Sequence, residues 1–418
     1  MASLILKVDR PAYGGLSIGK HEGKIVMISG AALPGETVEV TVEDEKRDYI
    51  KASVRTILEP SPLRIEPACK YFGSCGGCQL QHIPYEMQIN LKEDILRDCL
   101  KRLAKTETGL SAPLIDGDPW NYRLRGQFKV SHGDIGFYKE NTREIVDIDN
   151  CPLMAEEINE YLKAIRPVIK NIDVKEIHIT TGEESATAFI KPASGAKSVS
   201  DTKLSASKFL QLGFSGLCIE TQDKKIIRFG KGYVTLKLPG NQTYTVSPET
   251  FLQSHWRLNQ TVVEFIKDCL QPLKGRRVLD IYSGAGNFSI PLAIDADVTA
   301  VEENPYAVAD GRRNKEINNI KNCRFINSSA ENFHTRNNFD IIILDPPRAG
   351  ITNRLMEMIF SLRPGKIVYV SCNPATFSRD LKKLLSRYYL ESLRMIDFFP
   401  QTSHIESLAL LRADPDCS

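Results

Sequence analysis

The sequence predicts an α/β protein in which a doubly wound parallel sheet follows a small β-barrel and a mixed α+β segment. Two patterns lead to this prediction. From about residue 241, apolar runs of buried-strand type, such as RRVLDIY and FDIIILD, alternate with helical stretches, which indicates a parallel sheet with helices on both faces. In residues 1–58, short runs of alternating apolar and polar residues are separated by glycines, which is typical of a small antiparallel barrel.

Composition limits the classes of function. The 418 residues suit two to three domains. A net charge of +2 excludes a protein that coats nucleic acid by bulk charge, but not one with a local basic groove. The sequence has no apolar run of membrane-spanning length, and Lys7 and Asp9 come too early for a secretory signal. We expect a cytoplasmic protein with no membrane or obligate protein partner, in which clustered cysteines indicate metal binding or catalysis.

Three domains are predicted along the chain. Residues 1–58 form an OB-like barrel whose eight basic and eight acidic residues balance, so that charge does not by itself indicate a nucleic-acid partner. Residues 59–240 form a central α+β domain, with helical spacing over Tyr85–Leu103 and several short β-like runs after it. Residues 241–418 form the doubly wound sheet.

A glycine turn follows the first strand of that sheet. The segment Asp280-Ile-Tyr282-Ser-Gly284-Ala-Gly286-Asn287 comes directly after RRVL, and its two glycines let the backbone approach a ligand closely. A dinucleotide fingerprint needs a third glycine where this chain has Ser289, so NAD is disfavoured. Glu302 ends the next strand, where it can accept from both hydroxyls of a ribose. Together these features favour S-adenosylmethionine as the ligand.

Three more signals flank strands of the same sheet. Asp345-Pro-Pro-Arg348 ends FDIIILD, Ser371-Cys372-Asn373-Pro374 ends GKIVYVS, and His404-Ile-Glu406 precedes SLALLRA. Because doubly wound folds bind ligands at the carboxyl ends of their strands, we expect this thiol and these carboxylates to face the cofactor. They suit methylation of a pyrimidine: a thiolate on carbon 6 makes carbon 5 nucleophilic, and a base then removes the carbon-5 proton.

Cysteines cluster in the central segment. Cys69, Cys75 and Cys78 are spaced as C-x5-C-x2-C, and Cys151 is a fourth candidate ligand. Four thiolates can hold a zinc ion or a [4Fe–4S] cluster, and this spacing alone leaves both open. A radical methyltransferase, which needs an open iron on a three-cysteine cluster, is disfavoured because the first gap is five residues and a fourth cysteine is present.

Taken in order, these motifs resemble the RNA uracil-5-methyltransferase family, specifically its branch with a TRAM barrel and an iron–sulfur cluster that acts on 23S rRNA. The similarity covers nearly the whole chain, through SPETFLQSHWRLNQ (247–260), DIYSGAGNFSIPLA (280–293), DPPRAG (345–350), SCNPATFSRDL (371–381) and HIESLALL (404–411). It implies an N-terminal TRAM barrel, a central iron–sulfur domain and a Rossmann-like, class I methyltransferase domain.

The resemblance also implies roles for single residues. Cys372 would be the nucleophile, Glu406 the base that removes the proton, and Asp345 a contact of both the cofactor and the nucleophile's surroundings. The cofactor pocket would be lined by Gln253, Tyr282, Gly284, Asn287, Glu302 and Asp345. Through ACKYFGSCGGCQLQH and NCPLM, the resemblance implies that a [4Fe–4S] cluster is bound by Cys69, Cys75, Cys78 and Cys151. One position departs from the family, since the Asn of its Q-x-N is His255 here.

The expected partner is RNA, and the expected reaction is methyl transfer to carbon 5 of a specific uridine in 23S rRNA. Candidate RNA contacts are Phe251, which the resemblance places against a flipped base, and Arg123, Arg125 and Arg348. A tRNA T-loop uridine methyltransferase is the nearest alternative, because archaeal members with that target also carry the cluster. A further alternative is an RNA cytosine-5-methyltransferase, which is disfavoured by the DPPR motif, the cysteine cluster and the HIE motif. Another is a non-catalytic RNA-binding factor, which would not bind S-adenosylmethionine.

Overall fold

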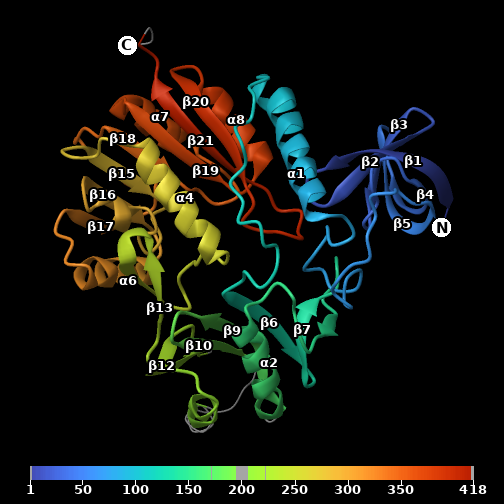
Figure 1. Cartoon of the computed structure of the whole chain (residues 1–418), viewed down its shortest axis with the longest axis horizontal. Helices are drawn as coiled ribbons and strands as arrows, with labels where there is room; N and C mark the ends of the chain where they lie inside the picture. Colours follow the sequence, from blue (N-terminus) through green and yellow to red (C-terminus); the bar gives the residue numbers. More distant parts are fainter. Residues whose placement is uncertain (1, 171, 194–205, 222, 416–418) are drawn as a thin grey trace.

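The computed structural model describes residues 2–170, 172–193, 206–221 and 223–415. It consists of an N-terminal barrel, a central sheet and a large C-terminal sheet (Figure 1). Helix α1 lies between the barrel and the C-terminal sheet, and the central sheet lies below both in this view. No helix among the described residues is long and apolar enough to cross a membrane.

The barrel confirms the prediction for the N-terminal segment. Its five strands close in the order β1-β2-β3-β5-β4, and alternate residues such as Val26, Val38 and Val40 are fully buried inside it. This alternation explains why the sequence reads as short runs of period two. The strands are β1 (Ser3–Ala12), β2 (Leu16–His21), β3 (Lys24–Ser29), β4 (Thr37–Glu45) and β5 (Tyr49–Glu59).

The central sheet has seven strands in the order β12-β11-β10-β9-β6-β7-β8. Helix α2 (Glu156–Ile169) packs on it through Ile158, Leu162 and Ile165, which recur at helical spacing and are fully buried. The strands are β6 (Arg125–Ser131), β7 (Asp134–Tyr138), β8 (Ile145–Asp147), β9 (Val174–Thr181), β10 (Ala186–Pro192), β11 (Gly216–Glu220) and β12 (Ile226–Gly230). The hairpin of β13 (Val234–Leu238) and β14 (Gln242–Val246), with the 3-10 turn η2 (Pro239–Asn241) between its strands, leads from it to α4 (Trp256–Cys269).

The C-terminal sheet has the order β17-β16-β15-β18-β19-β21-β20. Its first five strands pair in parallel, as predicted, whereas β21 runs antiparallel to both β19 and β20. The strands are β15 (Arg277–Ile281), β16 (Asp297–Glu302), β17 (Cys323–Asn327), β18 (Ile341–Leu344), β19 (Lys366–Ser371), β20 (Tyr388–Ile396) and β21 (Glu406–Ala413). The helices are α5 (Ser289–Leu292), α6 (Pro305–Ile317), α7 (Asn353–Leu362) and α8 (Pro374–Leu384).

Helix α1 (Tyr85–Cys99) belongs to the core of this C-terminal sheet, although it lies within the predicted central segment 59–240. Its Ile89 and Leu96 share a buried cluster with Leu279, Ile342 and other residues of one sheet face. A π-helical turn, η1 (Leu100–Ala104), extends α1 and packs against α8. The opposite sheet face packs on α4. Both sheet faces are therefore covered, which gives the strands their continuous apolar sequences.

Candidate active site

Three of the predicted catalytic residues lie at one edge of the C-terminal sheet. Cys372 directly follows Ser371 of β19, Glu406 begins β21, and Ser371 pairs with Ser407 in the antiparallel ladder. Cys372 and Glu406 therefore stand opposite one another at the end of this strand pair. Asp345 directly follows β18, which pairs with the other side of β19. Three adjacent strands thus bring a thiol and two carboxyls to one place.

Burial makes these groups hard to ionise. It raises the pKa of the Cys372 thiol to about 11, with smaller contributions from Glu406 and Asp345, and the nearby Arg348 acts in the opposite direction. Burial raises the pKa of Asp345 to about 7. Burial, followed by the nearby Asp345 and Asp397, holds the pKa of Glu406 well above its usual range. The Oε2 atom of Glu406 is buried and has no hydrogen-bond partner in the described structure, so it is available to a ligand.

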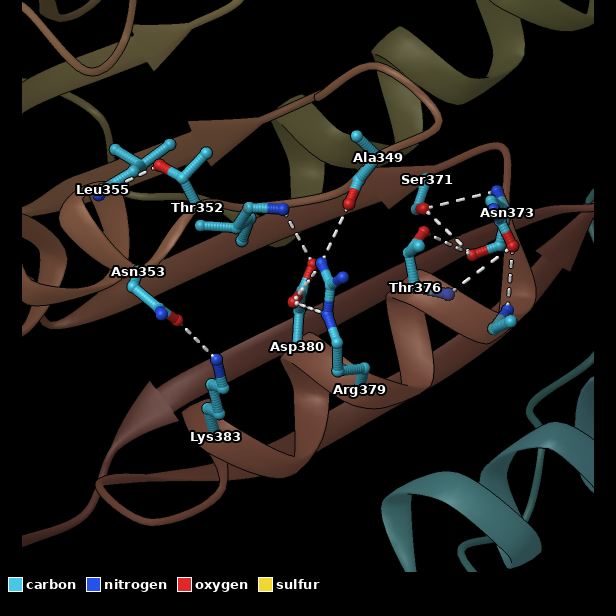
Figure 2. A network of polar contacts seen from close by, with 12 residues as sticks. Ala349, Thr352, Asn353, Leu355, Ser371, Asn373, Thr376, Arg379, Asp380 and Lys383 are labelled. Carbon is cyan, nitrogen blue, oxygen red and sulfur yellow. Dashed lines mark hydrogen bonds and ion pairs between the residues drawn. The ribbon is translucent and has the colours of Figure 1, made fainter.

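A polar network fixes the two turns that carry Asp345 and Cys372 (Figure 2). The Arg348 carbonyl accepts from Asn373 Nδ2 and Thr376 Oγ1, both at 3.1 Å. Asn373 also caps α8, because its Oδ1 accepts from the backbone N–H of Ala375. Deeper in the network, Asp380 Oδ2 accepts from the backbone N–H of Ile351 at 2.8 Å. The loop after β18 and the loop after β19 are therefore held together.

The residues of this network can pack around position 350 because that position is a glycine. Its φ is +78°, and a Cβ atom there would lie 2.3 Å from Asp380 Oδ2. Arg379 passes beside it to donate to the carbonyl of Ala349 at 2.8 Å. Only glycine fits both the backbone angle and the space.

The glycine turn lies where the sequence predicts it, between β15 and α5. Gly284 has a φ of +54°, and its backbone N–H donates to Glu302 Oε2 at 3.0 Å. The second oxygen of Glu302 accepts from the backbone N–H of Asn304 at 2.8 Å. Tyr282 has a φ of +66° and packs at the margin of the sheet core. The carboxylate at the end of β16 is thus oriented by two backbone donors.

The remaining predicted cofactor residues are Gln253, in the segment before α4, and Asn287, in the glycine turn between β15 and α5. Asn287 and Asn259 exchange a pair of side-chain hydrogen bonds at 2.8 and 3.0 Å. Gln253 is 8% exposed, and its Oε1 has no partner within the described structure. Asn259 was not among the predicted site residues, although it lies within the quoted SPETFLQSHWRLNQ run. An orphaned buried oxygen beside a glycine turn is suited to a polar ligand.

Asp280 is a second site residue that the sequence analysis did not single out. It is fully buried in β15, where Ser289 Oγ donates to its Oδ2 at 2.5 Å and its Oδ1 has no partner in the described structure. Burial, with smaller contributions from Asp345 and Glu302, raises its pKa to about 7. Its position within the D-x-x-x-G-x-G pattern was the available signal.

His255, where the chain departs from the family pattern, has a local structural role. It caps α4 by accepting from the backbone N–H of Leu258, and it stacks on Tyr122 with ring centroids 4.7 Å apart. Burial lowers its pKa to about 4, so it is neutral near pH 7.

Three of the four predicted RNA contacts line one groove of about 740 Å³ between the central sheet and residues 248–254. They are Arg123, Arg125 and Phe251, whose ring is 67% exposed. Arg125 is held internally, because it donates to Thr180 Oγ1 and to the carbonyls of Thr250 and Ser247. Arg348 lies apart from them, at the catalytic edge, with its Nη2 atom 3.5 Å from His404 Nδ1.

The four predicted metal ligands come together. Cys69, Cys75, Cys78 and Cys151 all line a single cavity of about 80 Å³, with Arg123 in its wall. Burial raises the pKa of three of these thiols, that of Cys78 to about 12. Across the described residues, no three His, Cys, Asp or Glu side chains are positioned to hold a metal ion. The four thiols thus line a common cavity and do not converge on the position of a single ion.

Comparisons with known proteins agree with this architecture. The family model for tRNA (uracil-5-)-methyltransferase matches residues 84–414, and that for the TRAM domain matches residues 4–54. The chain is 35% identical to an uncharacterized RNA methyltransferase of Aquifex aeolicus, over 98% of each chain. It is 32% identical to a 23S rRNA (uracil(1939)-C(5))-methyltransferase of Shewanella amazonensis, over 97% of this chain and 95% of the relative.

A solved structure supports the fold of the whole chain. The tRNA (uracil-54, C5)-methyltransferase of Pyrococcus abyssi, in complex with S-adenosyl-L-homocysteine, superposes with a TM-score of 0.77 and 27% identity. The match covers 97% of this chain and 99% of that one. Together with a TRAM barrel, a doubly wound sheet and a thiol facing buried carboxyls, these matches show that the chain belongs to the uracil-5-methyltransferase family and is an S-adenosylmethionine-dependent enzyme that acts on RNA.

Proposed function

We propose that this chain methylates carbon 5 of a specific uridine in 23S rRNA. The observation that carries the proposal is the meeting of Cys372, Glu406 and Asp345 at the ends of three adjacent strands. A nitrogen or oxygen methyltransferase needs no thiol at this place, whereas carbon 5 of uracil becomes nucleophilic only after a nucleophile adds to carbon 6. The choice of 23S rRNA follows the relatives that share 32% identity over nearly the whole chain.

In the proposed mechanism, S-adenosylmethionine would supply a methyl group from a positively charged sulfonium sulfur, which keeps the electron pair of the broken carbon–sulfur bond and leaves as S-adenosylhomocysteine. The Cys372 thiolate forms a bond to carbon 6 of the uracil. The π electron pair of the carbon 5–carbon 6 double bond then moves to carbon 5. After carbon 5 has gained the methyl group, the Glu406 carboxylate accepts the carbon-5 proton. The Cys372–carbon 6 bond then breaks, and the electron pair returns to sulfur.

The electrostatics of the site support this order of events. In the free protein, burial raises the pKa of Cys372 to about 11, so its thiol is protonated near pH 7, and burial also raises the pKa of Glu406 well above its usual range. A cation bound beside Asp345 would lower all three pKa values, because an opposite charge favours the ionised form. We therefore propose that the thiolate forms only when the cofactor is present.

The cofactor site would be built by the glycine turn and by the segment before α4. Glu302, already oriented by two backbone donors, would accept from the ribose hydroxyls. The unpaired Gln253 Oε1 would accept from another ligand group. Asp345 and Tyr282 would face the sulfonium end, while Gly284 and Asn287 shape the turn.

The RNA would enter through the groove lined by Phe251 and Arg123. A target uracil must leave its stack to reach Cys372, and an exposed aromatic ring such as that of Phe251 offers a surface for an unstacked base. The positive charge of Arg348 lies close enough to Cys372 to lower the pKa of its thiol. Arg348 is therefore placed to contact the RNA backbone or the target base. Arg125 would act by holding residues 247–250 to the central sheet.

The cysteine cavity fits the proposed [4Fe–4S] cluster. A single zinc ion needs its thiolates about 2.3 Å away, and the described residues offer no such arrangement. Four thiols around about 80 Å³ leave room for several atoms, since a water needs only about 10–15 Å³ on this measure. The nine described free cysteines also favour a reducing, cytoplasmic location.

A tRNA T-loop uridine is the second candidate substrate, which the likeness to the Pyrococcus abyssi enzyme favours. The test is transfer of labelled methyl from S-adenosylmethionine to unmodified 23S rRNA and tRNA transcripts, with wild type and Cys372→Ala in parallel. We expect 5-methyluridine in the rRNA from wild type only. Label in tRNA alone would change the substrate but keep the chemistry, label in cytosine would select the cytosine enzyme, and no label would favour a non-catalytic factor.

A further inference from the structure

The residues that precede the proposed base, 397–405, are held by the segment that carries the cysteines. Gln79, the residue after Cys78, donates its backbone N–H to the Gln401 carbonyl at 3.1 Å. Its side-chain Oε1 accepts from the backbone N–H of Ser403 at 3.2 Å. Leu80 also donates to the Gln401 carbonyl, at 3.0 Å. Cys78 is thus directly followed in sequence by a residue that contacts the loop leading into Glu406.

A second set of contacts fixes Gln401 itself. It is 3% exposed and has a φ of +67°, an angle that costs a residue other than glycine free energy. Its side chain accepts from Gln88 Nε2 at 2.8 Å, and its backbone N–H donates to Gln88 Oε1 at 2.9 Å. The same Gln88 nitrogen reaches the carbonyls of Leu80 and Ile83. The strained residue is therefore held from both sides by residues 79–88.

The other wall of the cysteine cavity reaches the same loop. Arg123 lines the cavity and lies over the ring of Phe399, 5.8 Å from its centroid. The Tyr122 hydroxyl donates to the Pro400 carbonyl at 3.0 Å. Residues on both sides of the cavity therefore contact residues 399–403.

The position of Glu406 depends on this loop. In the ladder of β20 and β21, Ile396 pairs with Glu406, so residues 397–405 connect two paired positions. The carboxyl Oε2 of Glu406 has no partner within the described structure. Its placement is consequently set by the backbone, which β19 and β20 hold from position 406 onward and which Gln79 and Gln88 hold through Gln401 in the residues before it.

We propose that Gln79 and Gln401 make the placement of Glu406 depend on whether the four-cysteine site is filled. This inference rests on the proposed roles of the four cysteines and of Glu406. A ligand shared by the four thiolates would fix the position of Cys78, and with it that of Gln79. When the site is empty, nothing links the four thiols, and the position of Gln79 is less restricted. Gln79 is then a positioning residue: it contacts neither substrate nor cofactor and acts through residues 401–403.

Hydrogen–deuterium exchange tests the link without reference to activity. In full-length wild type prepared without air, we expect slow exchange of the 397–406 amides, and faster exchange after a chelator has removed the iron. Gln79→Ala should exchange fast even with iron bound. Gln79→Glu, which keeps an oxygen that can accept from Ser403, should exchange nearly as slowly as wild type. Equal exchange with and without iron would overturn the proposal.

Kinetics should locate the effect at the proton-removal step. With iron bound, Gln79→Ala should lower kcat by about 10- to 100-fold, the range for residues that orient a catalytic group, with unchanged KM for RNA. Its rate of covalent capture by RNA that contains 5-fluorouridine should equal that of wild type, because the fluorine blocks only the later loss of a carbon-5 proton. Slower capture would show a general loss of the site and overturn the proposal.

The two proposals fail in different ways. If wild type transfers no methyl group but exchange at 397–406 responds to iron, the proposed function is wrong and the link stands. If wild type methylates RNA and Gln79→Ala behaves as wild type in both assays, the link is wrong. If Gln79→Ala binds little iron, Gln401→Gly serves instead, since it removes the side-chain contact of residue 401 with Gln88 Nε2 and suits the positive φ. Protein that carries no metal as isolated overturns the cluster and the link together.

Discussion

The catalytic edge and the cysteine cavity both bury acidic groups whose pKa values are raised, but they are built differently. Cys372, Asp345 and Glu406 stand at the ends of hydrogen-bonded strands, and a network around Asp380 fixes their turns. Cys69, Cys75 and Cys78 lie in a loop without strands of its own. Strand pairing brings the first three groups together, whereas the loop would rely on a shared ligand to set the distances between its thiols.

Replacement of the proposed base should give the largest effect at the catalytic edge. Glu406→Gln keeps the shape of the side chain but cannot accept the carbon-5 proton, so we expect kcat to fall by about 10²- to 10⁴-fold. A covalent protein–RNA complex should accumulate and survive a denaturing gel. Glu391→Gln, on exposed β20 where Glu391 pairs with Arg412, is the matched control. Unchanged turnover would remove Glu406 from the mechanism.

Loss of one proposed cluster ligand should lower stability, whereas loss of the proposed nucleophile should not. Cys78→Ala should abolish iron binding and lower the free energy of unfolding by about 3–4 kcal/mol, the effect of losing a ligand present at 100 to 1,000 times its Kd. Cys372→Ala should leave both unchanged. Iron analysis and thermal unfolding without air measure this difference, with Cys269→Ala as control. Equal stability of all three variants would contradict the contrast between the two sites.

The rigidity of the catalytic edge can be tested at Gly350. Gly350→Ala combines a positive φ with a contact of 2.3 Å to Asp380, so we expect a loss of about 2–3 kcal/mol of stability together with lower activity. Gly275→Ala shares the positive φ but meets no atom within 4 Å, so it should cost only about 1 kcal/mol. Urea unfolding measures both. Equal losses would show that the network around Asp380 yields easily.

A pH dependence of stability is expected from Asp280. Its folded pKa is about 7, against a usual value of 3.8, so the folded protein keeps a proton that the unfolded chain loses between these values. The free energy of unfolding should therefore fall as pH rises from about 4 to about 7. Asp280→Asn should remove most of this fall, which amounts to up to about 4 kcal/mol for a shift of this size. The control Asp295→Asn, at the surface, should leave the fall in the free energy of unfolding unchanged. Thermal unfolding at pH 5 and at pH 8 measures this fall for both variants.

The sequence predicted the barrel, the parallel strands and the meeting of Cys372 with Glu406, because period-two alternation and strand ends are local signals. It did not predict that α1 packs on the C-terminal sheet, or that β21 runs antiparallel, because both depend on contacts between residues far apart in the chain. Arg125 was expected at an RNA surface, yet its donors bind three internal oxygens. Partners of this kind are set by tertiary packing, which one sequence does not display.

The packing of α1 has a consequence for how the protein is made. Lys92 on α1 is fully buried and pairs at 2.6 Å with Asp397, 305 positions later in the chain. During synthesis, the apolar face of this helix leaves the ribosome long before the strands that cover it. A nascent chain therefore exposes a charged and an apolar surface until β20 and β21 have emerged, and Glu406, the proposed base, emerges in that same last step. Translation that stops before these strands leaves the apolar face of α1 uncovered and Lys92 without its partner.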